Sequence, residues 1–440
     1  MSGVAAGGAW RGYAVCAGVV YIVLAAAGWV PNPLPKLWDW IDRSEPVAPG
    51  AAKWQAQIGG TPRSVTIADD AVIVEYRTSI EAYGVGAGVR LWKSDADWSA
   101  VAGNGANPVV VTGRLATKGY QVLDAHTGAV RRSDNAATAV WTYTNAILDL
   151  HCGDPGCELT AWDPRGGDPL WRVPSPSLGF VLDGDNPDLP GTRPLTSGQI
   201  DDQIAGPTQM PALLGLPDGD QVRIVDTAAG KLVQTVAQGT RQRVALAGGR
   251  LLTVTGEARD GTCYYRVAAT DPPATDPVWQ RDVNLRTADD GAACRQDQDP
   301  VGGGDVVLGV DPVGQQVLIA AHDGRDLWHG TDGQRVMAVD DRYAVVRDAD
   351  GHTARGRSFA RGGAGWRRSI GAGAQAAVTP YAAVLVEPKQ QRVTAVSPGT
   401  GRVLAEVKTT GKPYAVGPGG LVLVSGRDLA YVPFAVDRAG

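Results

Sequence analysis

Short apolar runs separated by Gly, Asp and Pro dominate the chain after residue 50, and apolar residues at helical spacing are scarce there. Each run has the length of a β-strand, and the separating residues favour tight turns. The stretch VLDAHTGAVRR, residues 122–132, shows the pattern: a strand ends at Asp, a turn follows with Gly, and a second strand begins. Asp and Thr accept hydrogen bonds in such turns and Gly adopts a positive φ, so the pattern predicts a β-hairpin.

This hairpin recurs along the chain. Similar segments lie at residues 161–173, 224–236 and 395–407, and the repeating units are spaced by about 35 to 45 residues. Four short strands per unit at this period are typical of a β-propeller. A strict count gives eight hairpin units and one composite unit, but the unit near residue 300 lacks a clear innermost strand. We therefore expect an all-β fold, a single propeller of about eight four-stranded blades, with seven to nine allowed.

A propeller has to close into a ring. The strand at residues 53–58 is well placed to complete the last blade, whose other strands we expect between residues 413 and 434. Pairing of strands that are distant in sequence removes the open sheet edges that promote aggregation. The predicted propeller therefore spans residues 53–440.

Tryptophan is unusually abundant, with 13 residues against 3 phenylalanines. Five of them fall at the start of the last strand of a unit: Trp92, Trp171, Trp279, Trp328 and Trp366. A flat ring at this position can wedge between neighbouring blades and bury about 150–250 Å². The alternative is that these tryptophans are scattered through the core without a common role.

An Asp followed four residues later by Gly and then by a Trp at the start of a strand resembles the pyrroloquinoline-quinone-type β-propeller repeat. The segments that carry the resemblance are VLDAHTGAVRR, AWDPRGGDPLWRV and AAHDGRDLWHG, and it extends over roughly residues 54–436. The whole chain is similar to membrane-anchored, quinoprotein-like propellers of high-GC Gram-positive bacteria. The WD-repeat family matches less well, because no Gly-His and Trp-Asp pairing recurs.

The N-terminal region contains a run of 19 residues without charge, residues 12–30. At 1.5 Å per residue, such a helix would cross a hydrocarbon core of about 30 Å. We therefore expect a cytoplasmic tail at 1–11, a transmembrane helix or signal anchor at 12–30, and a Pro-rich linker at 31–52. A cleaved signal peptide is the alternative, because the three alanines at 25–27 fit a cleavage site.

Four cysteines lie beyond residue 50, an even number that fits an oxidising compartment. Cys152 and Cys157 flank the turn sequence GDPG and are expected to form a disulfide, which leaves Cys263 and Cys294 to pair by elimination. A metal site that includes His151 is the alternative for the first pair, although no second Cys/His pair lies nearby in the sequence. If these disulfides form, we expect the bulk of the chain to lie outside the cytoplasmic membrane.

Catalytic chemistry has little support in the sequence. Quinoprotein dehydrogenases of the resembling family hold pyrroloquinoline quinone with calcium, and often have adjacent cysteines, but no adjacent pair or matching ligand set occurs here. We therefore assign no catalytic, cofactor-binding or metal residue, and interpret the histidines as turn or surface residues. The net charge of −5 and the absence of a basic stripe argue against nucleic-acid binding, with residues 355–368 interpreted as a solvated basic face.

One long acidic and Pro-rich insertion, residues 180–207, is a candidate partner loop. Its Asp183, Asp185 and Asp188 could bind calcium, but the spacing departs from an EF-hand, so a solvated loop is the alternative. Long loops on a rigid scaffold often carry function. The expected function is therefore a non-catalytic extracytoplasmic binding or scaffold propeller, tethered to the membrane and facing a protein or cell-envelope partner. The alternative is a quinoprotein-type dehydrogenase.

Overall fold

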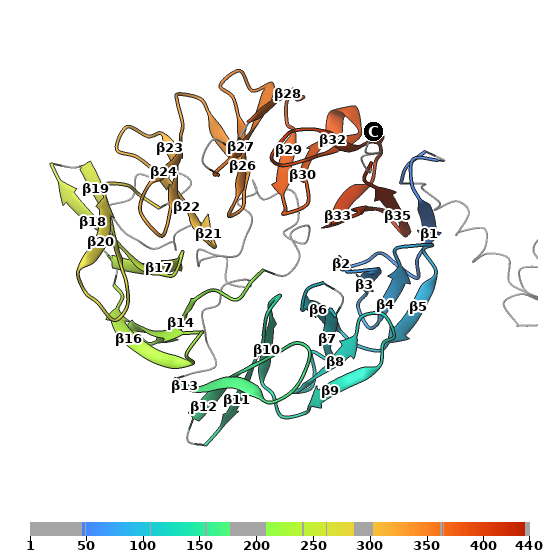
Figure 1. The fold of residues 1–440 in the computed structure, drawn as a ribbon, viewed down its shortest axis with the longest axis horizontal. Helices are drawn as coiled ribbons and strands as arrows, with labels where there is room; N and C mark the ends of the chain where they lie inside the picture. The colour runs from blue at the N-terminus through green and yellow to red at the C-terminus, as the bar shows by residue number, and fades with distance from the viewer. Residues whose placement is uncertain are drawn as a thin grey trace, which may run out of the picture.

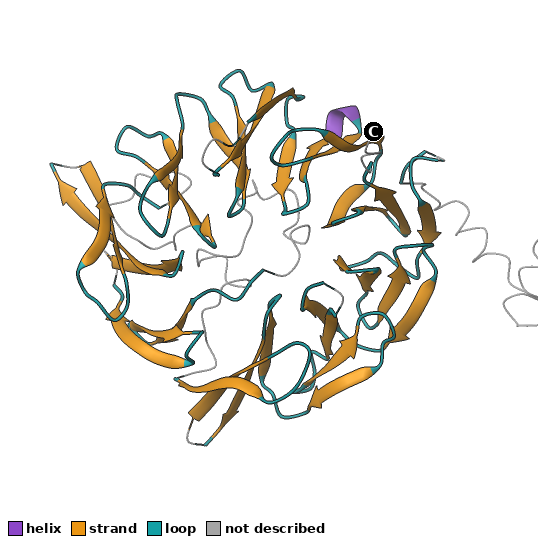
Figure 2. Ribbon diagram, in the orientation of Figure 1, coloured by secondary structure: helices purple, strands orange, loops and turns teal. Residues whose placement is uncertain are grey.

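The computed structural model describes most of the chain beyond the N-terminal region. The described residues are 46–48, 50–105, 107–154, 156–176, 208–239, 242–260, 262–285, 302–360, 363 and 365–435. They form nine antiparallel sheets arranged as a ring, the blades of a β-propeller (Figure 1). Almost all regular structure is strand, and the single helix among the described residues is a short 3-10 turn at Pro388–Gln390 (Figure 2).

The blades follow the chain around the ring. Blades 1 to 3 comprise β2 (Ser64–Ala68), β3 (Ala71–Glu75), β4 (Ile80–Gly84) and β5 (Arg90–Ser94); β6 (Trp98–Ala102), β7 (Val109–Gly113), β8 (Tyr120–Asp124) and β9 (Val130–Asp134); and β10 (Ala139–Thr142), β11 (Ile147–Gly153), β12 (Gly156–Trp162) and β13 (Pro169–Ser175). Blades 4 and 5 comprise β14 (Leu213–Asp218), β15 (Gln221–Asp226) and β16 (Lys231–Ala237); and β17 (Gln242–Ala247), β18 (Arg250–Arg259), β19 (Thr262–Thr270) and β20 (Pro277–Arg281).

The remaining blades complete the circle. Blades 6 and 7 comprise β21 (Gly302–Gly303), β22 (Val306–Val310), β23 (Gln316–Ala320) and β24 (Asp326–His329); and β25 (Arg335–Val339), β26 (Tyr343–Arg347), β27 (Thr353–Ser358) and β28 (Trp366–Ser369). Blades 8 and 9 comprise β29 (Gln375–Val378), β30 (Ala383–Glu387), β31 (Arg392–Val396) and β32 (Val403–Lys408); and β33 (Lys412–Gly417), β34 (Gly420–Ser425), β35 (Asp428–Pro433) and β1 (Trp54–Gln57).

Burial explains the hydrophobic pattern of each blade. The second strand of a blade is covered on both faces by the neighbouring blades, so it is apolar at nearly every position, as in β3 and β7. The outermost strand borders solvent and alternates between exposed and half-buried residues, as in β5 and β9. A strand that is buried on both faces is apolar at successive positions, whereas a strand with one face in solvent alternates between apolar and polar residues.

The ring closes through pairing of the two ends of the propeller. β1 pairs antiparallel with β35, with Trp54 opposite Tyr431. The rings of these two residues stack with centroids 5.9 Å apart. The predicted closure by residues 53–58 is therefore confirmed, and it joins the first described strand to the last sheet.

The propeller has nine blades rather than the eight expected, at the upper limit of the allowed range. The sequence does not predict the innermost strand of blade 6, because this strand is β21, which consists of two glycines and has no hydrophobic pattern. Four strands per blade hold for eight sheets, whereas blade 4 has three strands among the described residues.

Several parts of the sequence interpretation fall outside the described residues. These are the expected tail 1–11, the uncharged run 12–30, most of the linker 31–52, the insertion with Asp183, Asp185 and Asp188, and Cys294. Within the described part of the chain, no helix is long and apolar enough to cross a membrane.

Candidate functional site between blades 2 and 3

Tryptophans on the outermost strands pack against the turn that precedes the outermost strand of the next blade. Trp92 on β5 donates a hydrogen bond from Nε1 to the carbonyl oxygen of Ala125 in blade 2, at 2.8 Å. Gly128 of the same turn has a φ of 70°, and a Cβ at this residue would lie 2.7 Å from Cγ of Trp92. The Asp-to-Gly turn of the repeat is therefore a contact surface for the neighbouring blade.

The same arrangement recurs around the ring. Trp279 donates to the carbonyl oxygen of Ala321 at 2.8 Å, and Trp366 donates to that of Pro398 at 2.9 Å. Trp54 on β1 continues the series by donating to Val85 in blade 1 at 2.8 Å. The five predicted tryptophans all lie on outermost strands: Trp92 on β5, Trp171 on β13, Trp279 on β20, Trp328 on β24 and Trp366 on β28.

Blade 2 departs from this pattern, because Arg132 occupies the position that Trp92 has in blade 1. Arg132 lies opposite Val122 beside the bulge of its sheet, just as Trp92 lies opposite Ala82. Its guanidinium lies over the ring of Trp162 in blade 3, with Cζ 3.4 Å from the ring centroid. Arg132 therefore places a cation where blade 1 has an apolar tryptophan ring. A cation that is largely buried between two blades needs anionic partners.

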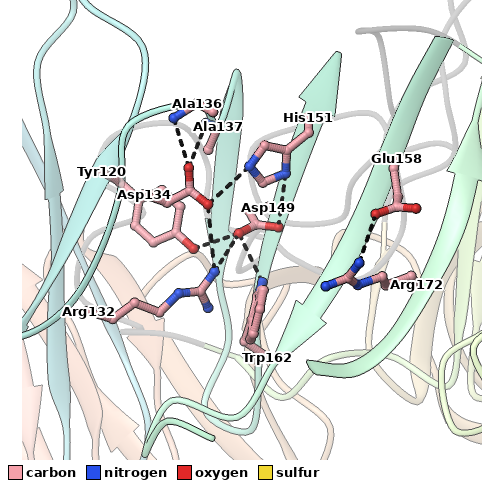
Figure 3. Close-up of polar contacts among 10 residues, drawn as sticks. All are labelled: Tyr120, Arg132, Asp134, Ala136, Ala137, Asp149, His151, Glu158, Trp162 and Arg172. Carbon is pink, nitrogen blue, oxygen red and sulfur yellow. Dashed lines mark hydrogen bonds and ion pairs between the residues drawn. The ribbon is translucent and has the colours of Figure 1, made fainter. Parts of the chain in front are cut away.

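Asp149 on β11 provides the anionic partner. It is fully buried, and its Oδ2 accepts hydrogen bonds from Tyr120 Oη at 2.7 Å, Arg132 at 2.9 Å and Trp162 Nε1 at 2.9 Å (Figure 3). Its other oxygen, Oδ1, is buried without a hydrogen-bond partner. Among the buried side-chain atoms that lack a hydrogen-bond partner in the described part of the chain, it is the one carboxylate oxygen, and such a group is costly to leave without a partner.

Asp134 and His151 complete the cluster at the same seam. Asp134, at the end of β9, accepts backbone hydrogen bonds at Oδ1 from Ala136 and Ala137, at 2.8 and 3.0 Å. Its Oδ2 lies 3.0 Å from Nε2 of His151 on β11, and Nδ1 of His151 lies 3.7 Å from Oδ1 of Asp149. Figure 3 shows the imidazole between the two carboxylates.

The electrostatics of the cluster favour the charged form of Asp134. Burial opposes ionisation of Asp134, but hydrogen bonds from Ala136, His151 and Ala137 outweigh it and lower the pKa of this carboxyl. Burial, together with the hydrogen bond to Asp149, raises the pKa of Tyr120 strongly, so the phenol stays neutral. Neutral and cationic donors therefore hold the carboxylate oxygens of the cluster in place.

Strand alternation separates this cluster from the disulfide. Asp149 and His151 point toward blade 2, whereas Leu148, Leu150 and Cys152 pack in the core shared with blade 4. Cys152 and Cys157 face each other across β11 and β12 and form a disulfide, which confirms that prediction. Since Cys294 is not among the described residues, the pairing of Cys263 with Cys294 stays a prediction.

Other buried carboxylates are paired with nearby donors. Asp348 accepts from Arg355 at 2.7 Å, and Glu387 accepts from Arg392 at 2.7 Å and from the backbone of Gly371 at 2.7 Å. Glu75 accepts from Ser99 of the next blade at 2.6 Å. These carboxylates link neighbouring strands or neighbouring blades through their hydrogen bonds. Asp149 differs, because one of its buried oxygens accepts no hydrogen bond.

The sequence interpretation did not find this cluster, because it considered His151 either as a partner of the cysteines or as a turn or surface residue, whereas His151 lies within β11. A signal was present, since two polar residues, Asp149 and His151, share one face of a second strand that is otherwise apolar. The partners Arg132 and Asp134 lie on another blade, and their approach depends on the ring geometry.

Comparisons with known proteins give similarity of fold only. No protein-family model and no curated protein sequence matches the chain. Among solved structures, BamB from Moraxella catarrhalis is 15% identical over 87% of this chain and 100% of its own, with a TM-score of 0.36. The quinohemoprotein alcohol dehydrogenase ADHIIG from Pseudomonas putida HK5 is 12% identical over 86% of this chain and 72% of its own, with a TM-score of 0.35. Apo AztD from Citrobacter koseri is 11% identical over 80% of this chain and 95% of its own, with a TM-score of 0.36. At these values the similarities carry no argument about activity, and the fold assignment rests on the nine sheets.

Proposed function

We propose that the chain is a non-catalytic binding propeller outside the cytoplasmic membrane, tethered by residues 12–30 and recognising a protein or cell-envelope partner. The observation that carries the proposal is a set of exposed apolar side chains on the outermost strands of five successive blades. They are Leu91, Val130, Leu170, Leu232 and Val278. We name this set the apolar rim.

The apolar rim lies where soluble proteins usually place charge. Its side chains are between 37% and 56% exposed, and each sits on the outermost strand of its sheet. An edge strand has unpaired backbone groups, and charged residues commonly protect it from pairing with other chains. Apolar residues that recur at such edges indicate a surface that a partner covers, rather than one that faces only water.

The disulfide between Cys152 and Cys157 supports the location. Disulfides persist in oxidising compartments and are rare in the cytosol. An uncharged run near the N-terminus would then hold the propeller at the outer surface of the membrane. The alternative, a quinoprotein dehydrogenase, is not favoured by any arrangement of the described residues, and it is an outcome of the experiment below.

The experiment compares partners retained by the wild type and by a variant of the apolar rim. Leu170→Glu and Val278→Glu change two rim residues that are 51% and 52% exposed, so both should leave folding intact. Leu115→Glu and Val313→Glu are matched controls, because these residues are more exposed, at 74% and 77%, and lie in turns outside the outermost strands. Each protein is cross-linked in cells and purified from native membranes.

We expect a specific partner with the wild type and the controls, and its loss with the rim variant. The same partners with the rim variant as with the wild type would refute the apolar rim as the binding surface. Incubation of the purified protein with calcium and pyrroloquinoline quinone tests the alternative, since co-elution of the cofactor's absorbance would favour a dehydrogenase.

A further inference from the structure

We propose that Asp134, Asp149 and His151 form a binding site for a divalent transition metal, for which zinc is the best-fitting ion, at the seam between blades 2 and 3. The three residues are the single group of this kind among the described residues, with one ligand atom from each lying within 4.8 Å of the others. The proposal does not depend on the apolar rim or on the membrane tether.

The distances suit a metal ion after small side-chain movements. Zinc binds imidazole nitrogen and carboxylate oxygen at about 2.0–2.2 Å, which places tetrahedral ligand atoms about 3.3–3.6 Å apart. His151 Nδ1 and Asp149 Oδ1 are 3.7 Å apart, and His151 Nε2 and Asp134 Oδ2 are 3.0 Å apart. Rotation of the imidazole can therefore present one nitrogen to an ion that also contacts both carboxylates.

The buried oxygen of Asp149 is the independent observation that points to a ligand. Asp149 is 0% exposed, and its Oδ1 has no hydrogen-bond partner although it faces Nδ1 of His151. Leaving a buried carboxylate oxygen without a partner is costly, and a metal ion between Oδ1 and the imidazole would remove that cost.

The surrounding residues already orient the ligands. Tyr120, Arg132 and Trp162 all donate to Oδ2 of Asp149, so Oδ1 is the atom left to bind an ion. Backbone groups of Ala136 and Ala137 hold Oδ1 of Asp134 in the same way and direct Oδ2 inward. Metal ligands are typically fixed by such outer contacts, which set their orientation and basicity.

Charge and ligand type narrow the choice of ion. Two carboxylates and one guanidinium leave a net charge of −1 when His151 is neutral, which favours a cation but makes binding weaker than at a site without Arg132. Imidazole with carboxylate suits zinc and related transition metals better than magnesium or calcium, which prefer oxygen ligands. Three protein ligands leave a position for water, and the side chain of His151 is 34% exposed, so an ion can enter from solvent.

The test measures zinc binding by calorimetry with the full-length protein in detergent, purified without a polyhistidine tag and with its disulfides intact. We expect one zinc ion per chain, no comparable binding of magnesium, and a zinc-dependent rise in melting temperature. Asp149→Asn keeps the shape and the acceptor oxygen but removes the charge, and it should weaken zinc binding at least tenfold. His151→Ala changes a half-buried residue and should have the same effect, which covers the possibility that the Asp149 variant does not fold.

His329→Ala is the matched control. His329 also lies between two carboxylates, 2.8 Å from Asp311 and 3.7 Å from Asp326, but the side chain of Asp326 is 39% exposed. The control should bind zinc like the wild type. X-ray absorption of the bound zinc should show nitrogen and oxygen neighbours without sulfur.

Wild-type affinity in both Asp149→Asn and His151→Ala would overturn the site. The absence of zinc binding in the wild type would mean that His151 alone bridges the two carboxylates, and this too would overturn the proposal. Sulfur in the metal shell would place the ion at cysteines instead. None of these outcomes bears on the partner-binding experiment, so the two proposals can fail separately.

Discussion

Replacement of Trp279 by Ala should destabilise the whole ring, because this side chain joins blades 5 and 6. The residue is 9% exposed, its Nε1 donates to Ala321 at 2.8 Å, and its ring lies against Gly324 of the next blade. A Cβ at Gly324 would come 2.7 Å from Cγ of Trp279, which shows how closely the backbone and the ring approach.

The size of the effect follows from the burial. Removing a buried aromatic side chain costs about 3–5 kcal/mol, including the cavity that remains. If the chain of 440 residues unfolds as one unit, its unfolding entropy is about 0.9 kcal/mol/K, at about 2.1 cal/mol/K per residue. The expected fall in melting temperature is therefore about 3–5 °C, and larger if fewer blades unfold together.

The assay is thermal unfolding of the full-length protein in detergent, followed by circular dichroism, so that loss of a tryptophan does not change the signal. Val278→Ala is the matched control, because Val278 is the preceding residue on β20 and is 52% exposed. Its free energy of unfolding should change by about 0.5 kcal/mol or less. Equal melting temperatures for Trp279→Ala and the control would refute the role of Trp279 as an inter-blade wedge.

Three further predictions concern the turn, the disulfides and the topology. Hydrogen bonds from Thr127 and Arg131 outweigh burial and lower the pKa of Asp124 to about 2, so its ionised form stabilises the fold above about pH 4, and this contribution falls as the pH drops through 2. Asp124→Asn should therefore cost about 2 kcal/mol at pH 7 but only about 0.4 kcal/mol at pH 2, as measured by denaturant titration. Alkylation without reductant and peptide mass analysis should show Cys152 linked to Cys157 and Cys263 linked to Cys294, and alkylation of all four would contradict both pairings. Protease added to intact spheroplasts should digest the propeller and leave a small membrane-held fragment, whereas a soluble protein that begins at Gly28 would show that the segment is cleaved.

The sequence was sufficient to predict the repeating element of the fold. Apolar runs of strand length, with Asp and Gly in the turns, predict hairpins because side-chain periodicity and turn chemistry are local properties. The segment at residues 122–132 contains the end of β8, a turn held by Asp124, and the start of β9. Closure through residues 53–58 was also predictable, because the ends of a ring have to pair.

Only the tertiary structure decided the blade number and the cluster between blades 2 and 3. Blade 6 begins with Gly302–Gly303, which carry no apolar pattern and become a strand only through pairing with β22. Arg132 and Asp149 are 17 residues apart and lie on different sheets. The sequence around each residue predicts the strand on which it lies, whereas the contact between Arg132 and Asp149 depends on how the two blades pack. Strand periodicity therefore determined the unit, and the packing of units around the ring decided which charged groups share a buried seam.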